Sequence, residues 1–273
     1  MERMKIAALQ TVSTPSVERN LATARRLVAQ AAREGARLAV LPEYFCFMGP
    51  DDRDKLAIAE APGDGPIQRA LADTAREHRL WIVGGTLPIR TADADFALNA
   101  NCVFGPDGQL AARYDKMHLF RYDNGRECYD EGRVLRAGDQ PVALDADGWR
   151  IGLSVCYDLR FPELYRALSF MPGHPPCDLV SVPAAFTYTT GRAHWELLLR
   201  ARAIENQCYV VAAAQGGIHE TGRRTWGHSM VVDPWGEVLG VLPEGEGVVM
   251  AEMDRERIAA VRTQLPALEH RRC

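Results

Sequence analysis

Arg150-Ile-Gly-Leu-Ser-Val-Cys-Tyr-Asp-Leu-Arg-Phe-Pro-Glu163 passes from an apolar run directly into a cysteine and then towards a second element. The run at 150–155 predicts a buried strand. Pro162 is tolerated in the first turn of a helix, so it predicts a short helix over residues 162–170. A strand followed at once by a helix favours an α/β fold, with Cys156 at the turn between the two elements.

The same alternation of elements extends in both directions from this stretch. Short apolar segments rich in β-branched residues alternate with amphipathic segments of helical spacing, which indicates parallel β-α-β connections. Strands are predicted at residues 5–9, 38–41, 81–86, 179–182, 209–214 and 248–253, and helices at residues 16–33, 65–78, 193–206 and 254–263.

Two turn signals add antiparallel strands to this pattern. Gly105-Pro-Asp-Gly108 separates strand-like residues 98–104 and 109–114, and Pro234-Trp-Gly236 separates 230–233 and 238–241, so each predicts a hairpin. The resulting strands are too many for one open sheet, which favours two packed mixed sheets with helices outside. We see no repeat or linker, so residues 1–273 are expected to form a single domain with a short basic tail. The charged segment 121–138 is expected to be a long functional loop.

Composition excludes several classes of function. The chain has 273 residues, 47% of them hydrophobic, and a formal net charge of −4, with the charges scattered. That pattern argues against a nucleic-acid partner. A membrane-spanning helix needs about 18 consecutive apolar residues, and no run of that length occurs. No signal peptide is expected at the N-terminus. The cysteine count is 7, an odd number, with no Cys-x-x-Cys, which is typical of a reduced, cytoplasmic protein.

Cys156 is the candidate nucleophile. A side chain at a strand-to-helix turn is held rigidly, and the backbone N–H groups of the turn lie near a developing oxyanion. A lone cysteine after an apolar strand is more often structural. The functional interpretation therefore depends on partners elsewhere in the chain.

Glu43 and Lys116 are the two candidate partners. Glu43 ends the predicted strand at 38–41, where open α/β sheets place their ligands, and partial burial would fit it to accept a thiol proton. Lys116 follows the first hairpin; an ammonium beside a cysteine favours the thiolate and can stabilise a tetrahedral oxyanion. Taken alone, each could equally be a solvated surface residue.

Three motifs in order resemble the Glu–Lys–Cys signature of the nitrilase, or carbon–nitrogen hydrolase, superfamily. They are Leu41-Pro-Glu-Tyr44, Tyr114-Asp-Lys-Met-His-Leu-Phe120 and Ser154-Val-Cys-Tyr-Asp-Leu-Arg-Phe-Pro-Glu163. The resemblance extends from Lys5 to Arg272. It implies a four-layer αββα sandwich, a Cys-Glu-Lys triad, hydrolysis of a non-peptide C–N bond without metal or cofactor, and a homodimer or higher homo-oligomer.

The second half of the chain is similar to one amidase branch of this superfamily, which contains deaminated-glutathione amidase and omega-amidase. The segments 193–207, 208–215 and 227–236 carry this resemblance, and Ala212-Ala-Ala-Gln-Gly216 with His270-Arg-Arg272 favours the former. In that branch a second glutamate after the lysine joins the site. Glu131 is the best positional match, and Glu127 is close enough to remain an alternative.

The three motifs suggest a mechanism. Glu43 takes the proton of Cys156, the thiolate attacks a carboxamide, and Lys116 with the backbone N–H of Tyr157 stabilises the oxyanion. Ammonia leaves with the proton from Glu43, and the thioester is hydrolysed by water that Glu43 activates and Glu131 helps to orient. The products are an acid and ammonia.

The expected small-molecule substrate, deaminated glutathione, carries carboxylates. Arg160 and Arg192 are candidates to bind them, since a guanidinium binds a carboxylate through two hydrogen bonds, although ion pairs with Glu163 or Glu196 are at least as plausible. Further candidates for the pocket wall are Phe186, Tyr188 and Thr189. The alternatives left open are an omega-amidase acting on 2-oxoglutaramate-like substrates, a nitrilase, a carbamoyl or ureido hydrolase, and an inactive binding scaffold.

Overall fold

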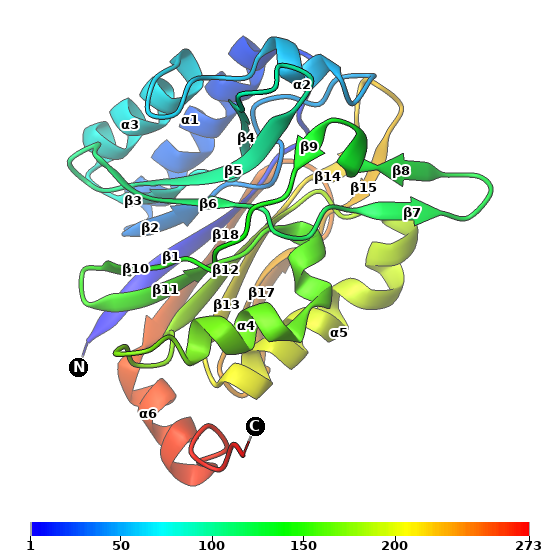
Figure 1. Cartoon of the computed structure of the whole chain (residues 1–273). Helices are drawn as coiled ribbons and strands as arrows, with labels where there is room; N and C mark the ends of the chain where they lie inside the picture. The colour runs from blue at the N-terminus through cyan, green and yellow to red at the C-terminus, as the bar shows by residue number, and fades with distance from the viewer. Residues whose placement is uncertain (1, 273) are drawn as a thin grey trace.

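Two mixed β-sheets pack face to face and carry helices on their outer sides (Figure 1). The computed structural model describes residues 2–272. The predicted αββα sandwich is therefore confirmed. No helix among those residues has the length and apolar character needed to cross a bilayer.

The first sheet is eight-stranded, with β1, β2 and β3 parallel to one another and β18 antiparallel to β1. Its strand order is β18-β1-β2-β3-β5-β4, and both β6 and β9 pair with β5. The bounds are β1 (Arg3–Gln10), β2 (Leu38–Val40), β3 (Trp81–Val83), β4 (Leu87–Arg90), β5 (Ala97–Phe104), β6 (Leu110–Asp115), β9 (Leu135–Arg136) and β18 (Gly247–Asp254).

The second sheet is six-stranded, in the order β10-β11-β12-β13-β16-β17. Its three central strands are parallel, and the outer ones pair antiparallel. The bounds are β10 (Ala143–Ala146), β11 (Trp149–Leu153), β12 (Leu179–Ala184), β13 (Tyr209–Ala214), β16 (Ser229–Val232) and β17 (Val238–Leu242).

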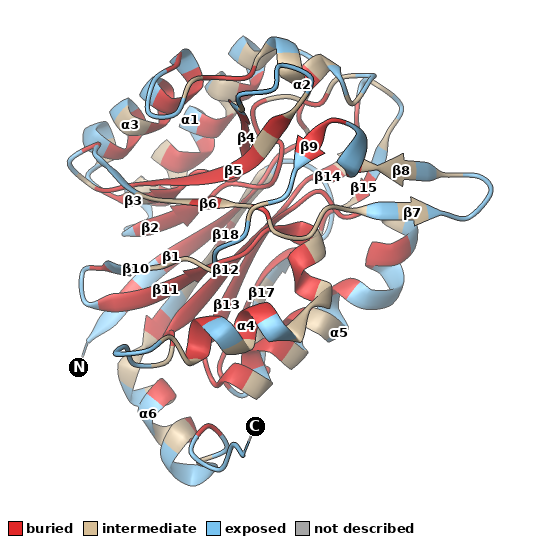
Figure 2. Ribbon diagram, viewed as in Figure 1, coloured by how far each residue is buried: buried red, intermediate tan, exposed pale blue. Residues whose placement is uncertain are grey.

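Side chains alternate between two cores because successive residues of a strand point to opposite faces. In β1, Ile6 and Ala8 belong to the cluster between the sheets, together with Ile151 of β11. Ala7 and Leu9 belong to a separate cluster with the first helices. Figure 2 shows both sheets largely buried, with exposed residues on the outer faces of the helices.

The helices form the outer layers. The first sheet is covered by α1 (Val17–Arg33) and α3 (Pro66–His78), and the second by α4 (Pro162–Ser169) and α5 (Tyr188–Asn206). The short α2 is Asp54–Ala57, and α6 is Arg255–Gln264. Ser16 caps α1 by accepting a hydrogen bond from the N–H of Arg19 at 3.3 Å.

Both predicted hairpins are confirmed, as β5–β6 and β16–β17. Two expectations need correction. The helix predicted at 193–206 begins at Tyr188, and the expected loop at 121–138 contains short elements. These are β7 (Arg121–Asp123), β8 (Cys128–Asp130), the 3-10 turn η1 (Glu131–Arg133) and β9. The β7–β8 hairpin projects from the sandwich in Figure 1. Its strands therefore have no face packed on the core, and the sequence shows none of the alternation of apolar and polar residues that predicts a strand.

Candidate active site

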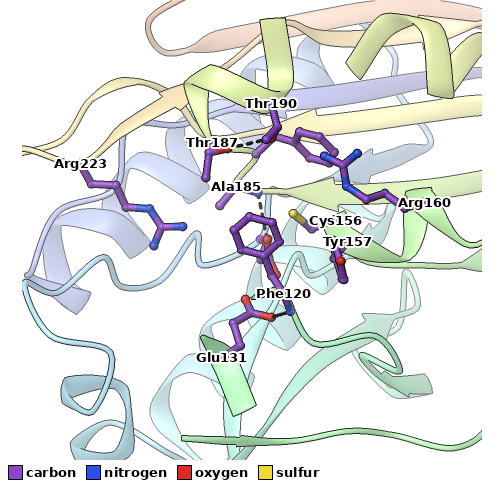
Figure 3. Close-up of a pocket in the computed structure, with 11 residues that line it drawn as sticks. Phe120, Glu131, Cys156, Tyr157, Arg160, Ala185, Thr187, Thr190 and Arg223 are labelled. Carbon is purple, nitrogen blue, oxygen red and sulfur yellow. Dashed lines mark hydrogen bonds between the residues drawn. The ribbon is translucent and has the colours of Figure 1, made fainter. Parts of the chain in front are cut away.

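A pocket lies where the segments that follow the strands of both sheets meet (Figure 3). It contains Cys156 together with acidic, aromatic and cationic side chains. Its lining residues are Glu43, Phe120, Glu131, Cys156, Tyr157, Arg160, Ala185, Phe186, Thr187, Thr190 and Arg223.

Cys156 begins the short 3-10 turn η2 (Cys156–Arg160) that links β11 to α4. Its φ is 50°, in the left-handed region, which costs about 1–3 kcal/mol in a residue with a side chain. The turn projects the thiol into the pocket, where the residue is 7% exposed. The predicted strand-to-helix nucleophile turn is present, and the N–H of Tyr157 lies within it.

The carboxylate of Asp158 holds this turn in place through hydrogen bonds. This buried carboxylate accepts hydrogen bonds from the N–H of Val155 at 2.8 Å and the hydroxyl of Tyr114 at 2.7 Å. It also accepts one from the N–H of His118 at 3.1 Å, and it contacts the Nδ1 of that residue at 2.7 Å. The Cys156 turn is thereby joined to the segment that carries Lys116.

Glu43 is 1% exposed and is the third residue after β2. Its Oε1 accepts hydrogen bonds from Lys116 Nζ at 2.8 Å and Asn99 Nδ2 at 2.9 Å, and its Oε2 accepts one from the N–H of Ala185 at 3.0 Å. The backbone carbonyl of Glu43 accepts a hydrogen bond from Gln215, which follows β13 of the other sheet. The side-chain carboxylate and the backbone carbonyl of Glu43 thus each accept a hydrogen bond from a residue of the second sheet's loops.

Lys116 lies fully buried between two carboxylates. Its Nζ is 2.8 Å from Glu43 Oε1 and 2.8 Å from Glu131 Oε2. Burial alone would lower the pKa of Lys116, but the charges of Glu131 and Glu43 outweigh it and hold the pKa well above its ordinary value. The side chain is therefore a fixed cation.

Glu131 opens η1 and belongs to the same network. It accepts hydrogen bonds from the Tyr44 hydroxyl and from the N–H of Phe120, each at 2.7 Å. Burial would raise the pKa of Glu131, but the charge of Lys116 and these hydrogen bonds lower it overall. Glu127 lies outside the pocket, where its half-buried side chain accepts a hydrogen bond from Thr189. Of the two candidates, the structure brings Glu131 to the site.

The thiol of Cys156 is neutral in this environment. Burial, the charge of Glu43 and a hydrogen bond with Glu43 raise the pKa of the thiol well above its ordinary value. The charge of Lys116 acts in the opposite direction, as the sequence suggested, but it is outweighed. The resting pair is thus a protonated thiol beside the Glu43 carboxylate, which suits Glu43 to a role as general base.

The expected substrate-binding residues divide into two groups. Arg160 and Phe186 line the pocket. Tyr188, Thr189 and Arg192 are on the first turns of α5 and are not among the pocket-lining residues. Tyr188 packs edge-on against Trp226, and Thr189 and Arg192 are exposed.

Five pocket residues were not predicted from the sequence: Phe120, Ala185, Thr187, Thr190 and Arg223. Phe120 follows Lys116 in its own motif, which was the available signal. Thr187 and Thr190 share a hydrogen bond at 2.8 Å at the start of α5, and only the correct helix start would have placed them.

Arg160 contacts a histidine rather than the carboxylates considered from sequence. Its Nη1 is 3.2 Å from His194 Nδ1, and its guanidinium lies over the rings of Phe186 and Tyr157. Glu196 pairs instead with Arg200. The charge of Arg160 therefore remains available to a ligand in the pocket.

Comparison with known proteins places these features in a family. The carbon–nitrogen hydrolase family model matches residues 5–263. Deaminated glutathione amidase from Synechocystis sp. is 42% identical, over 97% of this chain and 97% of that protein. The chloroplastic omega-amidase of Arabidopsis thaliana is 36% identical, over 100% of this chain and 73% of that protein.

A solved structure has the same fold. Saccharomyces cerevisiae Nit3, a member of the nitrilase superfamily, superposes with a TM-score of 0.88 at 31% identity. The alignment covers 100% of this chain and 97% of Nit3. The resemblance inferred from the three motifs is confirmed. Its cysteine and two glutamates line one pocket, and its lysine is bonded to both glutamates behind the pocket wall. This chain belongs to the carbon–nitrogen hydrolase family and is an amidase that acts on non-peptide C–N bonds.

Proposed function

We propose that Cys156, Glu43, Lys116 and Glu131 hydrolyse a small carboxylate-bearing amide, and that deaminated glutathione is the substrate. The observation that carries the proposal is the continuous network from Glu43 through Lys116 to Glu131 beside a protonated thiol. The name of the Synechocystis relative supports the choice of substrate.

Acylation begins when the substrate carbonyl approaches the thiol. Glu43 accepts the proton of Cys156 as sulfur attacks the carbonyl carbon. The negative charge that develops on the carbonyl oxygen is stabilised by the Lys116 ammonium and the N–H of Tyr157. Glu43 then returns the proton to the amide nitrogen, and the C–N bond breaks to leave a thioester on Cys156.

Deacylation uses the same groups in reverse. Water loses a proton to Glu43 and attacks the thioester, and Glu131 helps to orient the water and Lys116. The thiolate leaves and recovers its proton from Glu43. Because Lys116 is held between two carboxylates, its charge stays in place through both steps.

The leaving group depends on the amide. A primary carboxamide releases ammonia, as expected from the sequence. In glutathione, however, the γ-glutamyl amide nitrogen belongs to cysteinylglycine, so hydrolysis there releases that dipeptide. Assays for this enzyme should therefore follow both ammonia and primary amine.

The test compares deaminated glutathione with 2-oxoglutaramate, a nitrile and a ureido acid, with acid, amine and ammonia followed together. We expect the highest kcat/KM for deaminated glutathione. Cys156→Ala should lower kcat by at least about 10⁴-fold and abolish the acyl adduct seen by mass spectrometry, with the thermal melt unchanged. Retained turnover or an adduct elsewhere would refute the proposal.

Omega-amidase activity is the second candidate. The chloroplastic Arabidopsis thaliana relative carries that name, which supports a short primary amide as the alternative substrate. A higher kcat/KM for 2-oxoglutaramate, with ammonia as product, would favour this reading.

We also infer a homodimer in a reducing, cytoplasmic setting. Several large apolar side chains of α5, β17 and the turn before β17 are exposed, which favours a protein partner. They are Leu197, Ile204, Trp235, Leu239 and Val241. The six cysteines of the described residues are free, which supports a reducing compartment. Light scattering at micromolar concentration tests the dimer, and a monomer would contradict it.

A further inference from the structure

Arg223 belongs to two neighbouring hollows. It lines the pocket of Cys156, and it also borders a second, larger surface hollow lined by residues 49–53, 128–130, 133, 134 and 221. Arg223 lies in the loop between β14 (Gly216–Ile218) and β15 (Arg224–Trp226). A substrate that extends from Cys156 into this second hollow must pass Arg223.

The charge of Arg223 has no acidic partner. No carboxylate within residues 2–272 forms a salt bridge with it, and its Nε is buried without a hydrogen-bond partner. Its contacts are the sulfur of Met48 at 3.7 Å and the ring of Tyr129 at 5.3 Å. A guanidinium that lines a pocket with unused donors is suited to bind a carboxylate of the ligand.

Arg160 and Arg223 face the nucleophile from different directions. Figure 3 shows them on opposite sides of the pocket, with Cys156 between them. The chain thus presents one cation on each side of the bond to be cleaved. A substrate that satisfies both has an anionic group on its acyl side and another on its amine side.

The order of the chemical steps and the position of the second hollow assign the two sides. The acyl group stays bonded to Cys156 until water arrives, so it belongs on the side of Arg160, which shares the η2 turn with Cys156. The amine must depart after the first step and can vary in length. It therefore belongs on the side of Arg223, where the second hollow gives it room.

We propose that Arg223 binds a carboxylate on the leaving amine, which makes amides of amino acids or short peptides the preferred substrate class. The inference rests on the proposed function and deepens it. Arg160 binds the acyl carboxylate common to all substrates, whereas Arg223 distinguishes a peptide leaving group from ammonia.

The experiment removes the charge from the enzyme and from the substrate in turn. The substrates are deaminated glutathione and an analogue in which ethylamine replaces glycine, so that only the terminal carboxylate is lost. The variant is Arg223→Gln. The matched control is Arg224→Gln, because Arg224 is the next residue on the same hairpin but is exposed, stacks on Tyr188 and pairs with Glu244 outside the pocket.

For the wild type we expect kcat/KM about 10- to 100-fold higher for the carboxylate than for the ethylamide, expressed mainly in KM, as charge-assisted hydrogen bonds give. Arg223→Gln should bring this ratio close to 1, and Arg224→Gln should leave it unchanged. An unchanged ratio in Arg223→Gln, or an equal loss in Arg224→Gln, overturns the assignment.

Binding separates this inference from the proposed function. Calorimetry with the Cys156→Ala protein should show about 10-fold or more tighter binding of deaminated glutathione than of the ethylamide, and Arg223→Gln in that background should abolish the difference. If the wild type hydrolyses neither compound, the proposed function fails. The role of Arg223 is then decided by this binding difference alone, and equal affinities refute it.

Discussion

The carboxylate of Asp158 accepts a hydrogen bond from the hydroxyl of Tyr114 at 2.7 Å and thereby ties the turn that begins at Cys156 to the strand that immediately precedes Lys116. Tyr114 lies on β6 of the first sheet, and Asp158 lies in the η2 turn that follows β11 of the second. The distance between sulfur and ammonium is therefore set by a bonded bridge as well as by the packing of the sheets.

Asp158→Asn should lower kcat by about 10- to 100-fold with little change in KM. The amide cannot accept all the hydrogen bonds that the carboxylate accepts, so the Cys156 turn shifts relative to Lys116. Steady-state kinetics on the folded protein measure the effect. Tyr114→Phe removes one of these bonds and should cost less. A fall in apparent kcat that merely follows the folded fraction would show a structural role only.

Glu131→Gln should destabilise the protein by about 3–5 kcal/mol at pH 7, because it leaves Lys116 with one charged partner in a buried site. The folded-state pKa of Glu131 is lowered, so its stabilisation is present above its ordinary value of 4.5 and is lost as the pH falls below it. Urea unfolding at pH 7 and pH 4 should therefore show a smaller difference from wild type at the lower pH.

The matched control is Glu127→Gln. Its side chain is half-buried, lies outside the buried network and, within residues 2–272, bonds to the hydroxyls of Thr189 and Tyr129, so stability should change by less than about 0.5 kcal/mol. Equal effects of the two variants would contradict the placement of Glu131 within the buried network.

Alkylation of Cys156 by iodoacetamide should accelerate steadily from pH 7 to pH 9.5. Only the thiolate reacts, and burial with the Glu43 charge raises the pKa of the thiol well above its ordinary value. Peptide mass spectrometry gives the rate, with the exposed Cys128 as an internal reference. Glu43→Gln removes one source of the raised pKa and should move the profile to lower pH. A rate independent of pH would indicate a resting thiolate instead.

Gly85→Ala should displace Glu43, the proposed general base, although Gly85 does not contact its side chain. Gly85 has a φ of +59°, and a Cβ there would lie 2.1 Å from the carbonyl oxygen of Pro42, the residue before Glu43. Because backbone must move, kcat and the melting temperature should both fall. Gly63→Ala is the control: its φ is +78°, but its Cβ would meet no atom within 4 Å. Gly63→Ala should lower stability by about 1 kcal/mol and leave kcat unchanged.

The sequence could predict that Glu43, Lys116 and Cys156 come together because each follows a strong local signal. Glu43 and Cys156 end buried parallel strands, and Lys116 ends a hairpin strand, where periodicity and turn chemistry are clear. Glu131 required the family resemblance, since it follows an exposed hairpin whose short strands have no alternation of apolar residues.

The substrate side was less predictable for two physical reasons. The start of α5 contains β-branched threonines and Gly191, which are weak helix formers, so tertiary packing decides where the helix begins. Once the helix begins at Tyr188, Thr190 is turned inward and Thr189 outward. Arg223 comes from a polar loop between two three-residue strands, where only the folded chain shows which cation faces the pocket.

Gln215 links the two sheets at the site. This one amide follows the second sheet, yet it bonds to Thr11, Ser13 and the backbone of Glu43, all of which follow strands of the first. Glu43, the proposed base, therefore comes from one sheet and Cys156, the proposed nucleophile, from the other. The hydrogen bonds of the Gln215 side chain hold the two sheets together beside them. Loss of turnover on heating should coincide with separation of the layers, and neither layer folded in isolation should cleave an amide.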